Sequence, residues 1–290
     1  MTAPGPRAGE VVRAALAASV ARLRTHESAA IDATDPEGVH QARVATRRLR
    51  SDLRTFAPLL EWAWAKALRG ELRWLGDALG HSRDADVLAA RLRQRVEALP
   101  GPARSTAAAV LVSLSQETSA AHGHLLSVLS SDRYVMLRER LAGAAEDPAL
   151  TAGAAAPASV VLPSLVREPW HALVEEVGAA GYEPTDIALH AIRIRAKRAR
   201  YAAEAVAPAV GEPAEHFAKA AAALQGLLGE HQDSVVAQVW LRRWDEGRAE
   251  EESAVAEVLV EEERRAALRV RGRWHVAWEK LADPGLTSWL

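Results

Sequence analysis

The chain has 290 residues, with 36 lysines and arginines against 38 aspartates and glutamates, and its formal net charge at pH 7 is -2. It contains no cysteine, which excludes disulfide bonds, thiolate metal sites and a cysteine nucleophile. No apolar run reaches the roughly 20 residues that a membrane span requires, so we expect a cytoplasmic protein without a membrane anchor. The short apolar stretch at residues 12–21 is interrupted by Arg13, and we read it as the first helix rather than a signal peptide.

Composition and apolar periodicity predict an all-α fold. Aromatic residues make up only 5% of the chain, and alternating β-branched runs between turn residues are missing. Residues 1–147 are expected to form a first helical half, with helices over 9–31, 37–57, 58–79, 82–98, 103–130 and 132–145. Residues 148–163 contain three prolines and no charge, which is typical of a linker. Residues 164–290 are expected to form a second half, with helices over 164–180, 185–207, 213–229, 232–248 and 251–282.

Three sequence patterns occur twice and in the same order. HQARVATRRLR at residues 40–50 matches HAIRIRAKRAR at residues 190–200. LGHSRDADV at 79–87 matches LGEHQDSVV at 228–236, and DRYVMLRERLA at 132–142 matches GRWHVAWEKLA at 272–282. Such a series indicates a duplicated unit. Two copies that pack together usually do so about a pseudo-twofold axis, so equivalent helices are expected to face each other.

Each repeated basic helix carries a stripe of cations. At about 100° per residue the cations fall on one face, and apolar residues such as Leu49 and Leu53 gather on the opposite face. Solvated helix faces normally mix signs because like charges one turn apart repel, yet residues 40–54 carry a net charge of +4 and residues 190–201 of +5. A stripe about 21 Å long suits a linear array of phosphates better than a single small anion. The stripes comprise His40, Arg43, Arg47, Arg50 and Arg54, and His190, Arg193, Lys197 and Arg200.

These motifs resemble the conserved histidine α-helical domain family, CHAD. The resemblance rests on the two basic helices, on LG-x-x-RD-x-DV at residues 79–87 and on LG-x-H-Q-D at residues 228–233. It implies two four-helix-bundle halves with internal pseudosymmetry and a basic central groove or pore that binds inorganic polyphosphate without catalysis. It also implies an association with polyphosphate granules, and a polyphosphate-metabolising enzyme is a candidate partner. The E-x-E-x-K strand of the triphosphate-tunnel domain that often accompanies this family is missing, so the chain resembles a stand-alone member.

The resemblance also implies which residues contact the ligand. Gln232 stands where the first half has Arg83, and Glu204 where it has Arg54, so the two halves are expected to contribute unequally. The implied contacts are His40, Arg43, Arg47, Arg50, Arg54, Arg83 and Arg133 in the first half, and His190, Arg193, Lys197, Arg198, Arg200, Tyr201, Lys219 and Arg273 in the second.

Two other functions compete with this interpretation. A nucleic-acid binder would interleave aromatic and basic residues, whereas only Tyr201 does so here. A metal-dependent phosphohydrolase could use Asp84 and Asp233 with the nearby His81 and His231. The two histidines do not superpose in the repeat, so we expect no metal or other cofactor, and we expect each aspartate to cap a helix or hold an arginine in position.

Overall fold

The computed structural model describes residues 5–31 and 36–290, and it confirms the all-α prediction. The described first half contains α1 (Ala8–Ile31), α2 (Pro36–Thr55), η1 (Ala57–Leu59), α3 (Trp62–Glu97), α4 (Gly101–Thr106), α5 (Ala108–Leu129) and α6 (Asp132–Glu146). The second contains α8 (Ser164–Ala180), α9 (Asp186–Val210), α10 (Glu212–Asp245), α11 (Glu250–Arg271), α12 (Trp274–Leu281) and α13 (Pro284–Thr287). Within the described ranges, no helix is both long and apolar enough to cross a membrane.

The longest helices, α3 and α10, correct the sequence-based boundaries. The separate helices expected over 58–79 and 82–98 are the single helix α3, and those expected over 213–229 and 232–248 are the single helix α10. The helix breaks that the sequence predicts at the leucine–glycine pairs 79–80 and 228–229 are therefore wrong. A glycine inside a helix costs only about 1 kcal/mol relative to alanine, which tertiary packing overrides. Leu79 and Leu228 are both buried at these points.

Other boundaries also differ. The helix expected over 103–130 consists of α4 and α5, and the helix expected over 251–282 is divided at Gly272 and Arg273 into α11 and α12. Residues 148–163 contain η2 (Ala152–Ala155) and α7 (Ala158–Val161). This segment is packed rather than loose, because Ala154 and Leu162 are buried and the Ala8 amide donates to the Ala156 carbonyl at 2.9 Å. The division of the chain into two halves at this segment stays a prediction.

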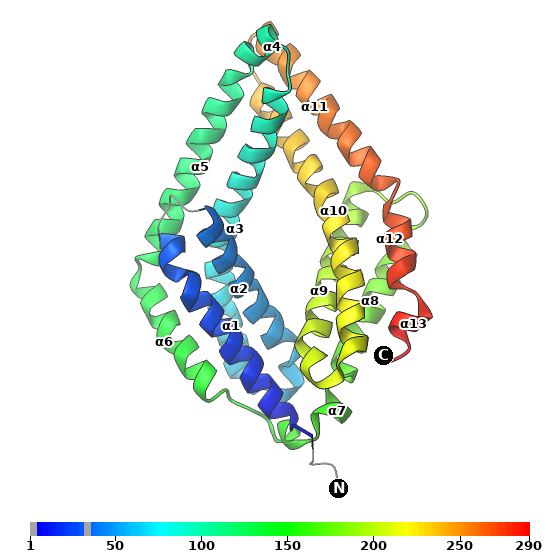
Figure 1. The fold of residues 1–290 in the computed structure, drawn as a ribbon. Coiled ribbons are helices and arrows are strands. Elements are labelled where there is room, and N and C mark those ends of the chain that lie inside the picture. The colour runs from blue at the N-terminus through cyan, green and yellow to red at the C-terminus, as the bar shows by residue number, and fades with distance from the viewer. Residues whose placement is uncertain (1–4, 32–35) are drawn as a thin grey trace.

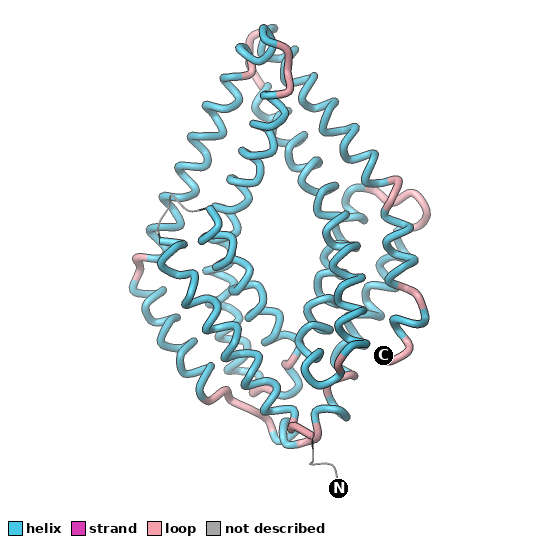
Figure 2. Tube along the Cα trace, in the orientation of Figure 1, coloured by secondary structure: helices cyan, strands magenta, loops and turns pink. Residues whose placement is uncertain are grey.

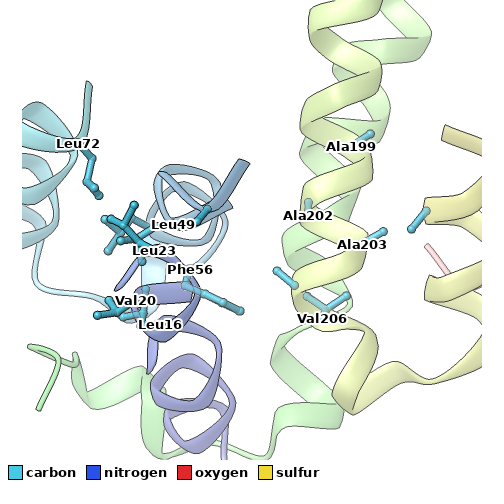
Figure 3. Close-up of a cluster of buried hydrophobic side chains, with 14 of the residues drawn as sticks. Leu16, Val20, Leu23, Leu49, Phe56, Leu72, Ala199, Ala202, Ala203 and Val206 are labelled. Carbon is cyan, nitrogen blue, oxygen red and sulfur yellow. The ribbon is translucent and has the colours of Figure 1, made fainter. Parts of the chain in front are cut away.

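One buried apolar cluster runs through both halves. In the first half, leucines of α1, α2 and α3 fill it, and Figure 3 shows Leu16, Leu49 and Leu72 among them. In the second half the buried face of α9 is made largely of small residues such as Ala199 and Ala202. Small side chains let neighbouring helices approach closely, and both α8 and α10 pack on α9. The apolar faces of α2 and α9 are thus held in the core, which fixes the direction of their basic faces.

A second buried cluster joins the halves at the opposite end of the molecule. It combines the ends of α3 and α10 with α5 and α11, through residues such as Leu92, Val110, Leu241 and Leu259. The halves therefore contact each other at both ends (Figure 1). Between these ends the ribbons diverge, with α2 and α3 on one side and α9 and α10 on the other (Figure 2). The predicted pseudo-twofold symmetry itself remains a prediction.

Candidate anion-binding site

The two basic helices begin and pack in ways that the sequence explains. The Thr185 side chain caps α9 by accepting the Ala188 amide at 3.2 Å, and Asp186 in the first turn complements the helix dipole. On α2, Leu49 and Leu53 have no exposed surface. Because one face of each helix is buried in this way, the charged residues are left on the faces that α2 and α9 present around their mutual contact.

A small cavity of about 190 Å³, which we call the basic cavity, lies between α2 and α9. Every charged residue in its lining is a cation, and none of these cations forms an ion pair with a carboxylate in the described part of the chain. Like charges gathered without counter-ions repel one another, so the cavity is suited to an anion. Its lining consists of Arg47, Arg50, Ser51 and Arg54 from α2 and Ile194, Lys197, Arg198 and Tyr201 from α9.

Arg47 of α2 interacts with two residues of α9, Tyr201 and Lys197. Arg47 donates from Nη2 to the Tyr201 hydroxyl at 3.2 Å, and its guanidinium lies 5.9 Å from the centre of that ring. Burial, followed by repulsion from arginines on both helices, Arg47 first and then Arg193, lowers the pKa of Lys197 to about 7. The Lys197 amine is therefore close to losing its proton at neutral pH for want of a negative neighbour.

Arg43 and Arg193 occupy equivalent places farther along the two stripes. A Cβ on Gly80 would lie 3.8 Å from Arg43 Nε, and a Cβ on Gly229 would lie 3.6 Å from Arg193 Nε. Each arginine thus crosses the neighbouring long helix at the glycine of the L-G motif. Burial is the main cause that lowers the pKa of both guanidinium groups, and Arg47 lowers both by repulsion.

The two motif aspartates lie inside α3 and α10, so neither caps a helix. Asp84 accepts a bond from Arg43 Nη2 at 2.9 Å, as the alternative prediction had it, but its side chain is 68% exposed. Burial raises the pKa of Asp233, while Arg193 and Arg91 oppose that shift. Within the described residues, no group of three or more potential metal-ligating side chains comes together.

The two motif histidines have different surroundings. His190 Nδ1 lies 2.7 Å from the Gln232 side-chain oxygen, while His40 Nδ1 is buried and has no hydrogen-bond partner among the described residues. Burial lowers the pKa of His40, with repulsion from Arg83 as the next cause. Arg83 and Gln232 hold equivalent sequence positions, so this pair of positions makes the halves unequal.

Arg200 belongs to an ion-pair network on the other side of the α2–α9 contact. Glu204 accepts from Arg200 Nε at 2.6 Å and also pairs with Arg48 across the two helices. Arg48 in turn lies 3.0 Å from the fully buried Asp52. Arg200 is thus neutralised by its own helix, and Glu204 turns away from the basic cavity that Arg54, its counterpart, lines.

Three of the predicted residues lie away from the two stripes. Arg133 pairs with Glu71 at 2.8 Å on the α3–α6 surface. Lys219 and Arg273 line a separate groove between α10 and α12. The structure brings together Arg43, Arg47, Arg50, Arg54, Arg193, Lys197, Arg198 and Tyr201, with His40 and Arg83 beside them.

Two further residues that the sequence did not predict, Ser51 and Ile194, line the basic cavity. Ser51 lies four residues after Arg47 and Ile194 three residues before Lys197, so helical spacing was the signal that could have indicated both. Repulsion from Arg69 on α3 contributes to the lowered pKa of both Arg50 and Arg54. In the sequence, Arg69 keeps helical spacing with Lys66 and Arg73 and could either extend the basic surface or pair with a nearby acid. The packing of α3 on α2 brings it close enough to Arg50 and Arg54 to extend the positive surface.

Comparison with known proteins identifies the family. The model of the CHAD domain matches residues 14–242, so the chain belongs to the CHAD family. Two Mycobacterium tuberculosis proteins, Rv2226 of strain H37Rv and MT2285 of strain CDC 1551, are each 33% identical to it over 262 residues. These alignments cover 87% of this chain and 49% of the relatives, so the chain spans about half the length of the curated relatives it matches.

Solved structures share the fold. PptA from Streptomyces chartreusis superposes with a TM-score of 0.78 at 22% identity, covering 94% of this chain and 100% of PptA. The CHAD domain from the plant Ricinus communis superposes with a TM-score of 0.70 at 24% identity, covering 98% of this chain and 94% of that domain. These likenesses support the all-α architecture described above.

Proposed function

We propose that the chain binds inorganic polyphosphate at the basic cavity and along the two adjoining stripes, without catalysing a reaction. The observation that carries this proposal is the lining of the cavity, where α2 and α9 contribute five cations and no carboxylate. A phosphate chain would supply the negative charge that these cations lack. It would also accept several charge-assisted hydrogen bonds from arginine at once.

A linear ligand fits the arrangement better than a single anion. The cations continue from Arg54 and Arg198, through Arg47 and Lys197, to Arg43 and Arg193 along both helices. A single phosphate would contact only one of these pairs of cations, whereas a phosphate chain would contact successive pairs over about 21 Å of helix. The proposed contacts are the α2 and α9 cations, with His40 and Arg83 at the far end.

The surroundings of Tyr201 favour polyphosphate over a single-stranded nucleic acid. Single-strand binders stack bases on exposed aromatic rings. Tyr201 is only 8% exposed and is already covered by Arg47 and Arg200, which lie 5.9 and 5.4 Å from its ring centre. No aromatic ring lining the basic cavity is therefore open to a base.

A titration with competitors tests this proposal. We expect polyphosphate to bind in a filter-binding or calorimetric assay, more weakly at higher salt, and to be displaced far less by DNA or RNA than by unlabelled polyphosphate. Arg47→Ala and Lys197→Ala should each weaken binding roughly tenfold, since hydrogen bonds to charged groups contribute about 1.5–3 kcal/mol. The exposed Arg264→Ala, whose side chain pairs with Glu261, is the matched control and should bind normally.

Two results would contradict the proposal. Equal displacement by nucleic acid would make the chain a nucleic-acid binder. Shortening of polyphosphate in the presence of magnesium or manganese, abolished by Asp84→Ala, would make it a phosphohydrolase.

If binding is confirmed, we further propose a location in the cytoplasm at polyphosphate granules and recruitment of a polyphosphate-metabolising enzyme, both of which co-localisation in cells would test.

A further inference from the structure

The contact between α3 and α6 in the first half is filled by an acidic and an aromatic side chain. Arg133, at the start of α6, donates from Nε to Glu71 at 2.8 Å. Its guanidinium also lies 4.3 Å from the centre of the Trp74 ring. Glu71 and Trp74 are three residues apart on α3, so they point to the same side of that helix. Together they neutralise Arg133 and cover part of its side chain, which stays 51% exposed.

The internal repeat places alanines at both corresponding positions of the second half. In the register that aligns the two L-G motifs, Glu71 corresponds to Ala220 and Trp74 to Ala223. The structure agrees with this register, because Leu75 and its counterpart Leu224 both have no exposed surface. The L-G glycines themselves also contact equivalent arginines, as described above.

The arginine occurs in both halves, whereas its two partners occur only in the first. Arg133 corresponds to Arg273, and the residues that follow them, Tyr134 and Trp274, are both buried in the core. Arg273 is exposed, as Arg133 is, but it makes no ion pair within residues 5–31 and 36–290, whereas Arg133 pairs with Glu71. The second half therefore presents the cation of this contact without its carboxylate and without its aromatic cover.

A groove of about 620 Å³ lies between α10 and α12 at this place. Its floor is made of small or aliphatic side chains, including Ala220, Ala223 and Val276, of which Val276 is 55% exposed. No acidic residue lines it. Its basic residues are His216, Lys219, Arg273 and Lys280.

We propose that this groove is a docking site for an acidic, aromatic helical segment of a partner protein. A glutamate or aspartate of the partner would pair with Arg273, as Glu71 pairs with Arg133 in the first half. An aromatic side chain three residues away would lie against the alanine floor and beside the Arg273 guanidinium, as Trp74 lies beside Arg133. The charge of the lining and the internal counterpart both favour this occupant. A flexible phosphate chain would satisfy the cations but leave the apolar floor uncovered.

The probe for this site is a labelled amphipathic peptide of about 15 residues, long enough to form a helix, with one glutamate and a tryptophan three residues later on its apolar face. Fluorescence anisotropy with the full chain should show saturable binding. Arg273→Ala should weaken it about tenfold, because the peptide carboxylate loses its partner. The exposed Arg269→Ala on α11 is the matched control and should leave the affinity unchanged, as should Arg47→Ala in the basic cavity.

A second variant introduces into the second half the two side chains that contact Arg133 in the first. Ala220→Glu with Ala223→Trp should fill the groove from within, pair with Arg273 and abolish peptide binding. If this double variant does not fold, as judged by circular dichroism, Arg273→Ala keeps the test decisive because the residue it changes is exposed. The proposal is overturned if the peptide does not bind, if Arg47→Ala rather than Arg273→Ala weakens it, or if polyphosphate or anionic vesicles bind in an Arg273-dependent way and the peptide does not. None of these results depends on whether the basic cavity binds polyphosphate.

Discussion

The basic cavity lacks a negative charge, and the residue that shows this most clearly is Lys197. Its amine lies among Arg47, Arg193 and Arg43, and burial with this repulsion lowers its pKa to about 7. Removing water from an ammonium group costs free energy that an opposite charge normally offsets. A phosphate chain between α2 and α9 would provide that charge and raise the pKa again, so binding and proton uptake should be coupled.

This coupling predicts a pH dependence of polyphosphate affinity. The contribution of charged Lys197 is complete below its pKa in the free protein, about 7, and is lost as the pH rises through the higher pKa of the complex. Affinity should therefore fall between pH 7 and 9, in calorimetric titrations that also measure proton uptake. Lys197→Arg, which keeps its charge, should flatten this part of the curve. An identical decline in that variant would contradict the assignment to Lys197.

The sequence predicted the residues of the site better than their partners. The stripes on α2 and α9 were visible in the spacing, since a 3.6-residue period determines which residues share a face. The pairing of Arg200 with Glu204 follows the i,i+4 spacing within α9. The pairing of Arg48 with Glu204 and that of Arg133 with Glu71 were not visible, because they depend on how the helices are rotated and on which carboxylate a neighbouring helix supplies.

At the scale of the element, α2 must approach α1 closely for its apolar face to reach the core. Gly38, in the first turn of α2, lies directly against Ala29 of α1: a Cβ added there would be 2.6 Å from the Ala29 Cβ and nearer still to the Ala29 backbone. The helix types and faces were predictable, but the need for this glycine was not. Gly80 and Gly229, where the sequence predicts breaks, lie inside continuous helices beside Arg43 and Arg193.

Gly38→Ala should therefore destabilise the fold. Overpacking of this kind typically costs about 1–3 kcal/mol, and its backbone contact cannot be relieved by a side-chain rotation. Gly123→Ala, inside α5 with nothing within 4 Å of the added Cβ, should be neutral or stabilising by up to about 1 kcal/mol. Denaturant unfolding of both variants measures the difference. Equal stabilities would show that the close α1–α2 contact does not constrain α2.

At the scale of the whole molecule, the halves are held together at two separate ends. One end is the shared apolar core with the Arg48–Glu204 ion pair. At the other end, Glu263 of α11 has no exposed surface and lies 2.8 Å from Arg95 Nε on α3. Arg91 of α3 binds the same carboxylate and donates to Ser234 of α10 at 2.6 Å. Both connections together set the separation of α2 and α9.

Glu263→Gln should destabilise the protein strongly. Removing one partner of a buried ion pair typically costs about 3–5 kcal/mol, because the remaining charges stay desolvated and unpaired. Glu261→Gln, the same change on the exposed face of the same helix, should have little effect on unfolding, since surface ion pairs contribute little. Equal effects of the two substitutions on the melting temperature would contradict the role of Glu263 in joining the halves.

We expect α2 and α9 to form one binding site for polyphosphate and not two independent basic surfaces. A double-mutant cycle of polyphosphate binding distinguishes these cases, with Arg47→Ala on α2, Lys197→Ala on α9 and the variant carrying both changes. One shared site predicts that the combined loss of binding free energy differs from the sum of the single losses by at least about 0.5 kcal/mol. Losses that add within that margin would show that the two helices bind independently, and single variants that bind as tightly as the unchanged protein would show that neither residue contacts the ligand.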